Sequence, residues 1–246
     1  TPGGKMREVM AGGLPVDSGP TVLTMRWVFD ELAREAGFSL GDFVSLKRAQ
    51  TIARHGWSDG ARLDLFADME QSIAAIKAFS SARDAEAYRR FARRAAGVYE
   101  TLKDSYIRAE RPNLPQLIHR IGFWRLGDLL GLSPYSSLAS ALDGLFEDRR
   151  LRQLFARYAT YCGSSPYAAP ATLMLVAHVE REGVWLIEGG MKRLAEGLAA
   201  MAQRCGAAIL YNRRAARILI EGGRACGVEL ADGERLAADA VIMNGD

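Results

Sequence analysis

The sequence predicts a mixed α/β (α+β) fold, in which part of a nucleotide-binding domain carries an inserted, largely helical subdomain. Three observations predict it. Residues 2–21 are rich in glycine turns, a helical pattern of apolar residues runs from Asp68 to Tyr158, and short strands with glycine turns follow a helix that begins near Met191. Such a long helical run is unusual inside a nucleotide-binding domain, so we interpret it as an insertion.

The composition indicates a globular protein without a nucleic-acid or metal site. The chain has 246 residues, and 49% of them are hydrophobic, which is ample for a core. Its 32 cationic and 29 anionic residues leave a net charge of +3, too small for a nucleic-acid-binding surface. The three cysteines are widely spaced, show no metal-ligand pattern with the three histidines and indicate a reducing cytoplasm. The sequence predicts no membrane-spanning helix and no export signal.

Two motifs near the start predict half of a nucleotide site. Gly3-Gly4-Lys5 lets backbone N–H groups and a cation approach a phosphate closely. Asp17-Ser18-Gly19-Pro20-Thr21 then reads as a tight turn that leads into a helix. A glycine pair alone is also common in ordinary turns. The chain begins at Thr1 and contains no G-x-G-x-x-G fingerprint, so we expect an internal fragment of a longer protein.

The elements that follow are predicted from spacing. Apolar residues at helical intervals from Met25 to Ala36 predict a helix that ends at Gly37. A short strand is expected over residues 43–46. A hairpin is expected around Asp59-Gly60. It would carry His55 and Trp57, and a lone histidine beside an aromatic residue is either structural or catalytic.

A long amphipathic helix is predicted from Asp84 to Arg111. Its four arginines at positions 89, 90, 93 and 94 form either a solvated basic face or a contact with anionic lipid. The apolar segment 117–130 suits an interfacial helix and a buried helix equally well. Ser133-Pro134 and Asp148 are expected to cap further helices.

The last quarter of the sequence returns to strands. A strand over 184–187 and a helix over 191–205, closed by Gly206, are predicted first. Strands are then expected over 207–211, 216–221, 225–230, from Arg235 onward and over 240–244. Gly222-Gly223 and Asp232-Gly233 supply the hairpin turns between them.

The two early motifs, in this order and at this distance, resemble the flavin-dependent amine oxidase and phytoene desaturase superfamily. In that superfamily a Gly-Gly-Arg segment follows the first βαβ unit of a Rossmann-like FAD-binding domain, and Asp-x-Gly-Pro-Thr lies against the flavin. Lys5 stands where the family usually has arginine, and lysine lacks the planar fork of a guanidinium group. The tail is similar as well, because Asn212, Ala215 and Ile218 occupy the pattern of one strand that passes the cofactor, with Ala215 in place of the usual valine. Ala238 to Asn244 match a second one.

The most specific resemblance is to bacterial phytoene desaturase-type carotenoid enzymes. In these enzymes a series of short motifs occurs in a fixed order along the chain. It begins with an aromatic residue, a turn of small residues, a proline, a second aromatic residue and Ala-Pro. His-Val-Glu-Arg, Gly-Val-Trp and Glu-Gly-Gly then follow. The matching positions are Tyr161, Gly163, Pro166, Tyr167, Ala169, Pro170, His178 to Arg181, Gly183 to Trp185, and Glu188 to Gly190. His55, Trp57 and Asp59-Gly60 resemble the hydroxyneurosporene (methoxyneurosporene) desaturase branch.

The resemblance implies an FAD-dependent oxidoreductase of carotenoid biosynthesis that desaturates an acyclic, hydroxylated or methoxylated carotenoid by hydride transfer to flavin. The cofactor-binding residues that it implies are Gly3, Gly4, Lys5, Asp17, Ser18, Gly19, Pro20, Thr21, Ala215 and Asn244. The candidates for lining the substrate are His55, Trp57, Tyr161, Tyr167, His178, Glu180 and Trp185, and no catalytic base is assigned. His178 and Glu180 would otherwise pair with each other or with backbone as fold determinants. We expect the fragment alone neither to hold flavin nor to turn over.

Three segments are expected to make up the domain organisation. Residues 1–67 form part of the FAD-binding domain and the start of the substrate domain, 68–183 form a helical substrate- and membrane-binding subdomain, and 184–246 return to the FAD-binding domain. A carotenoid is dissolved in lipid, so we also expect a peripheral location on the cytoplasmic side of a bacterial inner membrane. The alternatives are a non-catalytic isoprenoid-binding or escort protein of the same fold, or another flavin oxidoreductase: a carotenoid isomerase, a ketolase or an amine oxidase.

Overall fold

The computed structural model describes residues 1–109, 116 and 136–244. The expected segment 117–130 and the Ser133-Pro134 cap lie outside these residues. The helices are α1 (Arg26–Glu35), α2 (Met69–Phe79), α3 (Ala82–Leu102), α6 (Leu138–Asp143), α7 (Arg149–Ala156), α8 (Leu175–Glu182) and α9 (Lys192–Arg204). The strands are β1 (Glu8–Ala11), β2 (Leu14–Asp17), β3 (Leu46–Arg48), β4 (Thr51–Gly56), β5 (Arg62–Phe66), β6 (Trp185–Ile187), β7 (Ala215–Glu221), β8 (Arg224–Leu230) and β9 (Arg235–Ala237).

The strand pairs are short and antiparallel throughout the described part of the chain. β1 pairs with β2, β4 with β5, β3 with β6, and β7, β8 and β9 form a three-stranded sheet in that order. The mixed α/β class is therefore confirmed, as are the hairpin at Asp59-Gly60 and the two hairpin turns of the tail.

Two predicted strands are wrong, and a third is displaced. Residues 207–211 and 240–244 are not in strands, because no neighbouring described segment pairs with their backbone groups. The strand expected over 43–46 is instead β3, which starts at Leu46. A single 3-10 turn, Leu40–Asp42, comes directly before the expected strand, and a capping box between Ser39 and Asp42 stabilises this turn.

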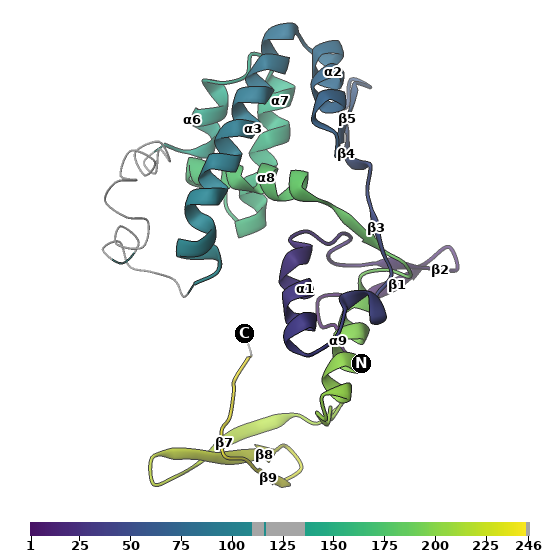
Figure 1. Ribbon diagram of the computed structural model, residues 1–246, viewed down its shortest axis with the longest axis vertical. Coiled ribbons are helices and arrows are strands. Elements are labelled where there is room, and N and C mark those ends of the chain that lie inside the picture. The colour runs from purple at the N-terminus through teal and green to yellow at the C-terminus, as the bar shows by residue number, and fades with distance from the viewer. Residues whose placement is uncertain (110–115, 117–135, 245–246) are drawn as a thin grey trace.

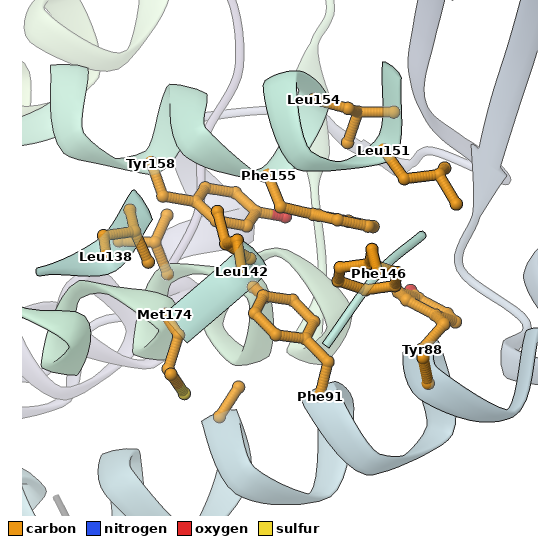
Figure 2. Close-up of a cluster of buried hydrophobic side chains, with 14 of the residues drawn as sticks. Tyr88, Phe91, Leu138, Leu142, Phe146, Leu151, Leu154, Phe155, Tyr158 and Met174 are labelled. Carbon is orange, nitrogen blue, oxygen red and sulfur yellow. The ribbon is translucent and has the colours of Figure 1, made fainter. Parts of the chain in front are cut away.

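The larger hydrophobic core belongs to the helical layer. Helices α2, α3, α6, α7 and α8 surround it, and the hairpin β4–β5 adds Leu63 and Leu65 from one side (Figure 1). Aromatic rings fill its centre. The Phe155 ring lies 4.9 Å from that of Phe91 and 5.6 Å from that of Tyr88 (Figure 2). The apolar stripe predicted for the long helix faces this core.

A second, smaller core lies between α1, β6 and α9. It is joined to the helical layer by the β3–β6 pair, in which Leu46 lies opposite Ile187 and Arg48 opposite Trp185. The chain therefore leaves the smaller core after β3 and returns to it at β6, with the helical layer in between. The hairpin β4–β5 packs with the helices, although it precedes Asp68 in sequence.

Side-chain caps define several helix starts. Asp68 caps α2 and Ser81 caps α3, and the predicted cap Asp148 accepts a hydrogen bond from the Arg150 N–H of α7 at 2.8 Å. The buried carboxylate of Asp84 accepts from the backbone N–H groups of Glu147 and Asp148 at 2.7 and 3.1 Å. This carboxylate therefore fixes α7 against α3, which sets the position of Arg157 at the end of α7.

Candidate functional site

Three glycine-bearing segments meet beside the smaller core. Gly3 and Gly4 have φ angles of 120° and 49°, and the Met6 N–H closes the turn on the Gly3 carbonyl at 2.7 Å. Gly19 approaches this turn so closely that a Cβ atom on it would overlap the Lys5 carbonyl oxygen. The two early motifs are thus in backbone contact, as only glycine permits at that position.

The third segment, Gly189-Gly190-Met191, comes from the other end of the chain. The Asp17 carboxylate accepts the Met191 backbone N–H at 3.0 and 3.1 Å, and a Cβ on Gly190 would lie 2.9 Å from Asp17 Oδ1. This carboxylate sits at the N-terminus of α9, where the helix dipole favours a negative charge. Asp17 therefore acts as the residue that joins the third segment to the first two.

These residues fit a phosphate-bearing cofactor such as FAD. Gly4, Lys5, Gly19, Pro20 and Thr21 are all exposed, so the surface that the glycines form is open on one side. Exposed glycine backbone beside a lysine offers N–H donors and positive charge without side chains in the way. When bound there, FAD would supply the capacity to accept a hydride.

The two remaining cofactor candidates lie on another element. Ala215 opens β7, and Asn244 is the last described residue. Both line a cavity of about 530 Å³ on the sheet β7–β8, together with Ile218 and Ile242. The structure brings Ala215 and Asn244 together, as expected of two segments that approach the same group.

Glu180 and Tyr161, two of the substrate candidates, meet in a buried polar cluster of the helical layer. The Glu180 side chain lies on α8 and the residue is 5% exposed. Arg157 donates to both of its oxygens at 2.9 and 2.7 Å, Tyr161 donates to Oε1 at 2.9 Å and Tyr158 to Oε2 at 3.1 Å. Every Glu180 oxygen thus has two donors, which explains how a carboxylate is tolerated there.

Burial favours the neutral forms of the two tyrosines in this cluster and of the nearby His55. It raises the pKa of Tyr158 well above 10, with a further contribution from the Glu180 charge, and it raises the pKa of Tyr161 in the same way. Burial also lowers the pKa of His55, and the positive charge of Arg157 lowers it further. His55 therefore lies within the field of the cluster as an uncharged imidazole.

The other substrate candidates are distributed over three places. Trp57 packs on Phe79 at 5.1 Å between ring centroids and donates its indole N–H to Gln153 at 3.0 Å. Tyr167 is 81% exposed, at the rim of a cavity over α6 and α7. Trp185 lies on β6, where the guanidinium carbon of Arg26 is 4.6 Å from its ring centroid.

His178 and Glu180 do not pair with each other. They occupy different faces of α8: His178 Nε2 lies 3.6 Å from Glu182, and its ring lies 4.7 Å from that of Tyr99. Burial lowers the pKa of His178, while the Glu182 charge opposes this shift. His178 therefore belongs to the junction between α8 and α3.

Two parts of the site were not assigned a role by reasoning from the sequence. Glu188 to Gly190 were identified as a matching Glu-Gly-Gly segment, but their place beside the Gly3-Gly4 and Asp17-to-Thr21 motifs was not predicted. Arg157 carried no usable signal, because it lies at the C-terminal end of α7 and its partner Glu180 is 23 residues away. Among the described residues no group of His, Cys, Asp and Glu suits a metal ion.

Comparison with known proteins places these features in context. The family described as flavin containing amine oxidoreductase matches residues 1–246. The chain is 48% identical to hydroxyneurosporene desaturase of Rubrivivax gelatinosus over 247 residues, covering 100% of this chain and 47% of that protein. It is 45% identical to hydroxyneurosporene desaturase of Cereibacter sphaeroides, covering 100% and 49%. The chain thus spans about half the length of these curated relatives.

Solved structures show the same fold. An oxidoreductase from Methanosarcina mazei matches with a TM-score of 0.53 at 18% identity, over 96% of this chain and 49% of the other. A putrescine oxidase with bound putrescine matches with a TM-score of 0.55 at 13% identity, over 96% and 49%. At these identities the likeness concerns the fold alone.

Proposed function

Because this chain belongs to the flavin containing amine oxidoreductase family over the whole of residues 1–246, we propose that the complete protein is an FAD-dependent desaturase of an acyclic, oxygenated carotenoid. The observation that carries the proposal is the 48% identity to a hydroxyneurosporene desaturase across 100% of this chain. This match extends over the helical layer as well as the glycine segments, so it concerns the substrate side and the cofactor side together.

The glycine segments support the cofactor part of the proposal. Asp17 and Gly19 hold three backbone segments in contact, and the surface that results is exposed beside Lys5. A non-catalytic escort protein has no need to retain such a surface. When FAD is bound, it supplies the hydride acceptor for the removal of hydrogen from the carotenoid.

The helical layer supplies apolar surroundings and neutral polar groups. A long polyene has no charge to bind, so its position is set by apolar walls and few polar contacts. Glu180 is held by Arg157, Tyr158 and Tyr161 and acts as a positioning residue for α8. The uncharged imidazoles of His55 and His178 are able to accept or donate a hydrogen bond without placing a charge beside the polyene.

A product assay tests the proposed function. The complete protein, loaded with FAD, is incubated with 1-hydroxyneurosporene in liposomes, and the carotenoid absorption spectrum is recorded. We expect a red shift that requires FAD, because desaturation lengthens the conjugated system. An unshifted spectrum from flavin-loaded protein that has bound the carotenoid would instead favour the hypothesis of a non-catalytic escort protein.

We propose in addition that the complete protein works on the cytoplasmic surface of the bacterial inner membrane, where its lipid-dissolved substrate is found. No helix in the described part of the chain is long and apolar enough to cross a bilayer. The basic face of α3 is the contact that we favour, although carboxylates partly neutralise it. Arg89 pairs with Glu70 at 2.6 Å and Arg93 with Glu86 at 3.6 Å.

Replacing the four arginines of this face, at 89, 90, 93 and 94, with glutamine is expected to weaken the partition of the complete protein into anionic liposomes at least about fivefold. Each cationic residue near an anionic surface contributes about 1 kcal/mol, and the two carboxylate pairs reduce the total. Liposome sedimentation measures the effect. The matched control replaces Arg213, Arg214, Arg217 and Arg224 of the β7–β9 region, and equal losses in both variants would place the contact elsewhere.

A further inference from the structure

A cavity of about 280 Å³ is lined by residues of α1, of the end of α8 and of β6. Trp27 and Trp185 are its aromatic residues, and Asp30 and Glu182 are its acidic ones. Aromatic walls suit an apolar polyene. A hydrocarbon gains nothing from a carboxylate beside it, so the two acidic residues require a separate explanation.

The cavity lies where the cofactor side of the protein meets the substrate side. Leu23, two residues after Thr21 of the flavin motif, exchanges two backbone hydrogen bonds of 2.8 Å with Trp185. Glu182 is the last residue of α8, a helix of the helical layer. Hydride transfer requires the reacting carbons to contact the flavin while the rest of the polyene is held by apolar walls. The junction that carries this cavity meets both requirements.

Asp30 has a structural role within α1. Its Oδ2 lies 3.0 Å from Arg26 Nε, one turn away on the same helix. The guanidinium carbon of Arg26 in turn lies 4.6 Å from the ring centroid of Trp185. Asp30 therefore neutralises Arg26 and orients it on the Trp185 ring, which accounts for one of the two carboxylates.

Glu182 has no such counter-ion among the described residues. The basic side chain beside it is His178, whose Nε2 lies 3.6 Å from Glu182 Oε1. Burial lowers the pKa of His178, so the imidazole is neutral and leaves the carboxylate uncompensated. Tyr99, the neighbour on α3, is also neutral, because burial and the Glu182 charge both raise its pKa. The Glu182 side chain is 37% exposed, so it is accessible from the cavity that it lines.

From these features we infer that Glu182 is the catalytic base of the desaturation, the group that accepts the proton leaving the carotenoid. This inference rests on the proposed function. An uncompensated carboxylate on the wall also stabilises positive charge that develops on the polyene as the hydride leaves. The two tasks explain why a carboxylate is present in an aromatic cavity.

The step balances as follows. From one carbon of the polyene, hydrogen leaves with both electrons of its bond as a hydride, which FAD accepts, and a positive charge remains on the chain. From the adjacent carbon, the Glu182 carboxylate takes a proton, and the two electrons of that C–H bond form the new double bond. Glu182 is then a carboxylic acid, which returns the proton to solvent.

The test replaces Glu182 with glutamine in the complete, FAD-loaded protein. Glutamine keeps the size of the side chain but does not accept a proton. With 1-hydroxyneurosporene in liposomes, we expect kcat to fall at least about a hundredfold, the usual contribution of a general base. The flavin content and the carotenoid Kd, measured by quenching of tryptophan fluorescence, should stay within about twofold of wild type, since no binding contact is removed.

The matched control is Glu100→Gln. Glu100 is an exposed residue of α3 whose charge also acts on Tyr99 and His178, but it does not line the cavity. We expect its kcat to equal that of wild type. Equal losses in both variants, or a loss in Asp30→Asn but none in Glu182→Gln, would overturn the inference while leaving the proposed desaturation intact. A wild-type protein that binds the carotenoid without converting it would overturn both, so the two failures are distinguishable.

Discussion

Replacing Gly19 with alanine is expected to abolish flavin binding by the complete protein. The new Cβ would overlap the Lys5 carbonyl oxygen, a backbone atom that has no rotamer by which to move away. The Asp17-to-Thr21 turn and the Gly3-Gly4-Lys5 turn must then separate, and Asp17 would lose its position under Met191. We expect flavin retained after gel filtration to fall at least about a hundredfold, since several backbone contacts to one ligand are lost together.

Gly97→Ala is the matched control for this substitution. Gly97 lies in the middle of α3, and a Cβ there meets nothing within 4 Å. The change should leave flavin content unaltered and stabilise the helix slightly, by up to about 1 kcal/mol, because alanine has the higher helix propensity. Flavin content in Gly19→Ala equal to that of Gly97→Ala would show that the contact between the two motifs is not required for the cofactor.

Replacing Arg157 with methionine is expected to destabilise the helical layer by about 3 to 5 kcal/mol, because it leaves the buried Glu180 carboxylate without its counter-ion. Two tyrosine hydroxyls would remain as donors, and both are kept neutral by burial, so they cannot replace the positive charge. Chemical denaturation of the complete protein, followed by circular dichroism, measures the shift.

Two further variants isolate the cause of that loss. Arg83 forms a 2.7 Å ion pair with Glu147, but its side chain is 76% exposed, so Arg83→Met should cost less than about 1 kcal/mol. Combining Arg157→Met with Glu180→Gln removes both charges. The amide oxygen still accepts from one tyrosine hydroxyl and the amide N–H donates to the other, so most of the stability should return. A double variant as unstable as Arg157→Met alone would mean that packing by the Arg157 side chain, and not its charge, stabilises the layer.

The elements predicted from local spacing are largely those of the structure. Helix α1 with its Gly37 end, the cap Asp148 and the hairpin turns all depend on residues close in sequence, which local propensity describes well. The strands expected over 207–211 and 240–244 are wrong because a strand also needs a partner, and none is present in the described chain. Hairpin β1–β2 was not predicted, although its Gly12-Gly13 turn was a visible signal.

The candidate site, too, was predicted where its contacts join segments close in sequence and was not predicted where they join distant segments. The contact between Gly19 and the Lys5 carbonyl joins two motifs 14 residues apart, and the resemblance to flavin enzymes, now confirmed by the family match, predicted that they act together. The hydrogen bond from Met191 to Asp17 spans 174 positions, and no local pattern encodes it.

The most direct test of the account is a single-turnover experiment on the complete protein. FAD-loaded protein is mixed anaerobically with 1-hydroxyneurosporene in liposomes, and the flavin band and the carotenoid band are followed in one cuvette. We predict that the flavin bleaches while the carotenoid spectrum shifts to the red, with equal rate constants and one flavin reduced per double bond formed. A carotenoid that binds and leaves the flavin oxidised would contradict the proposal that this family member is a desaturase.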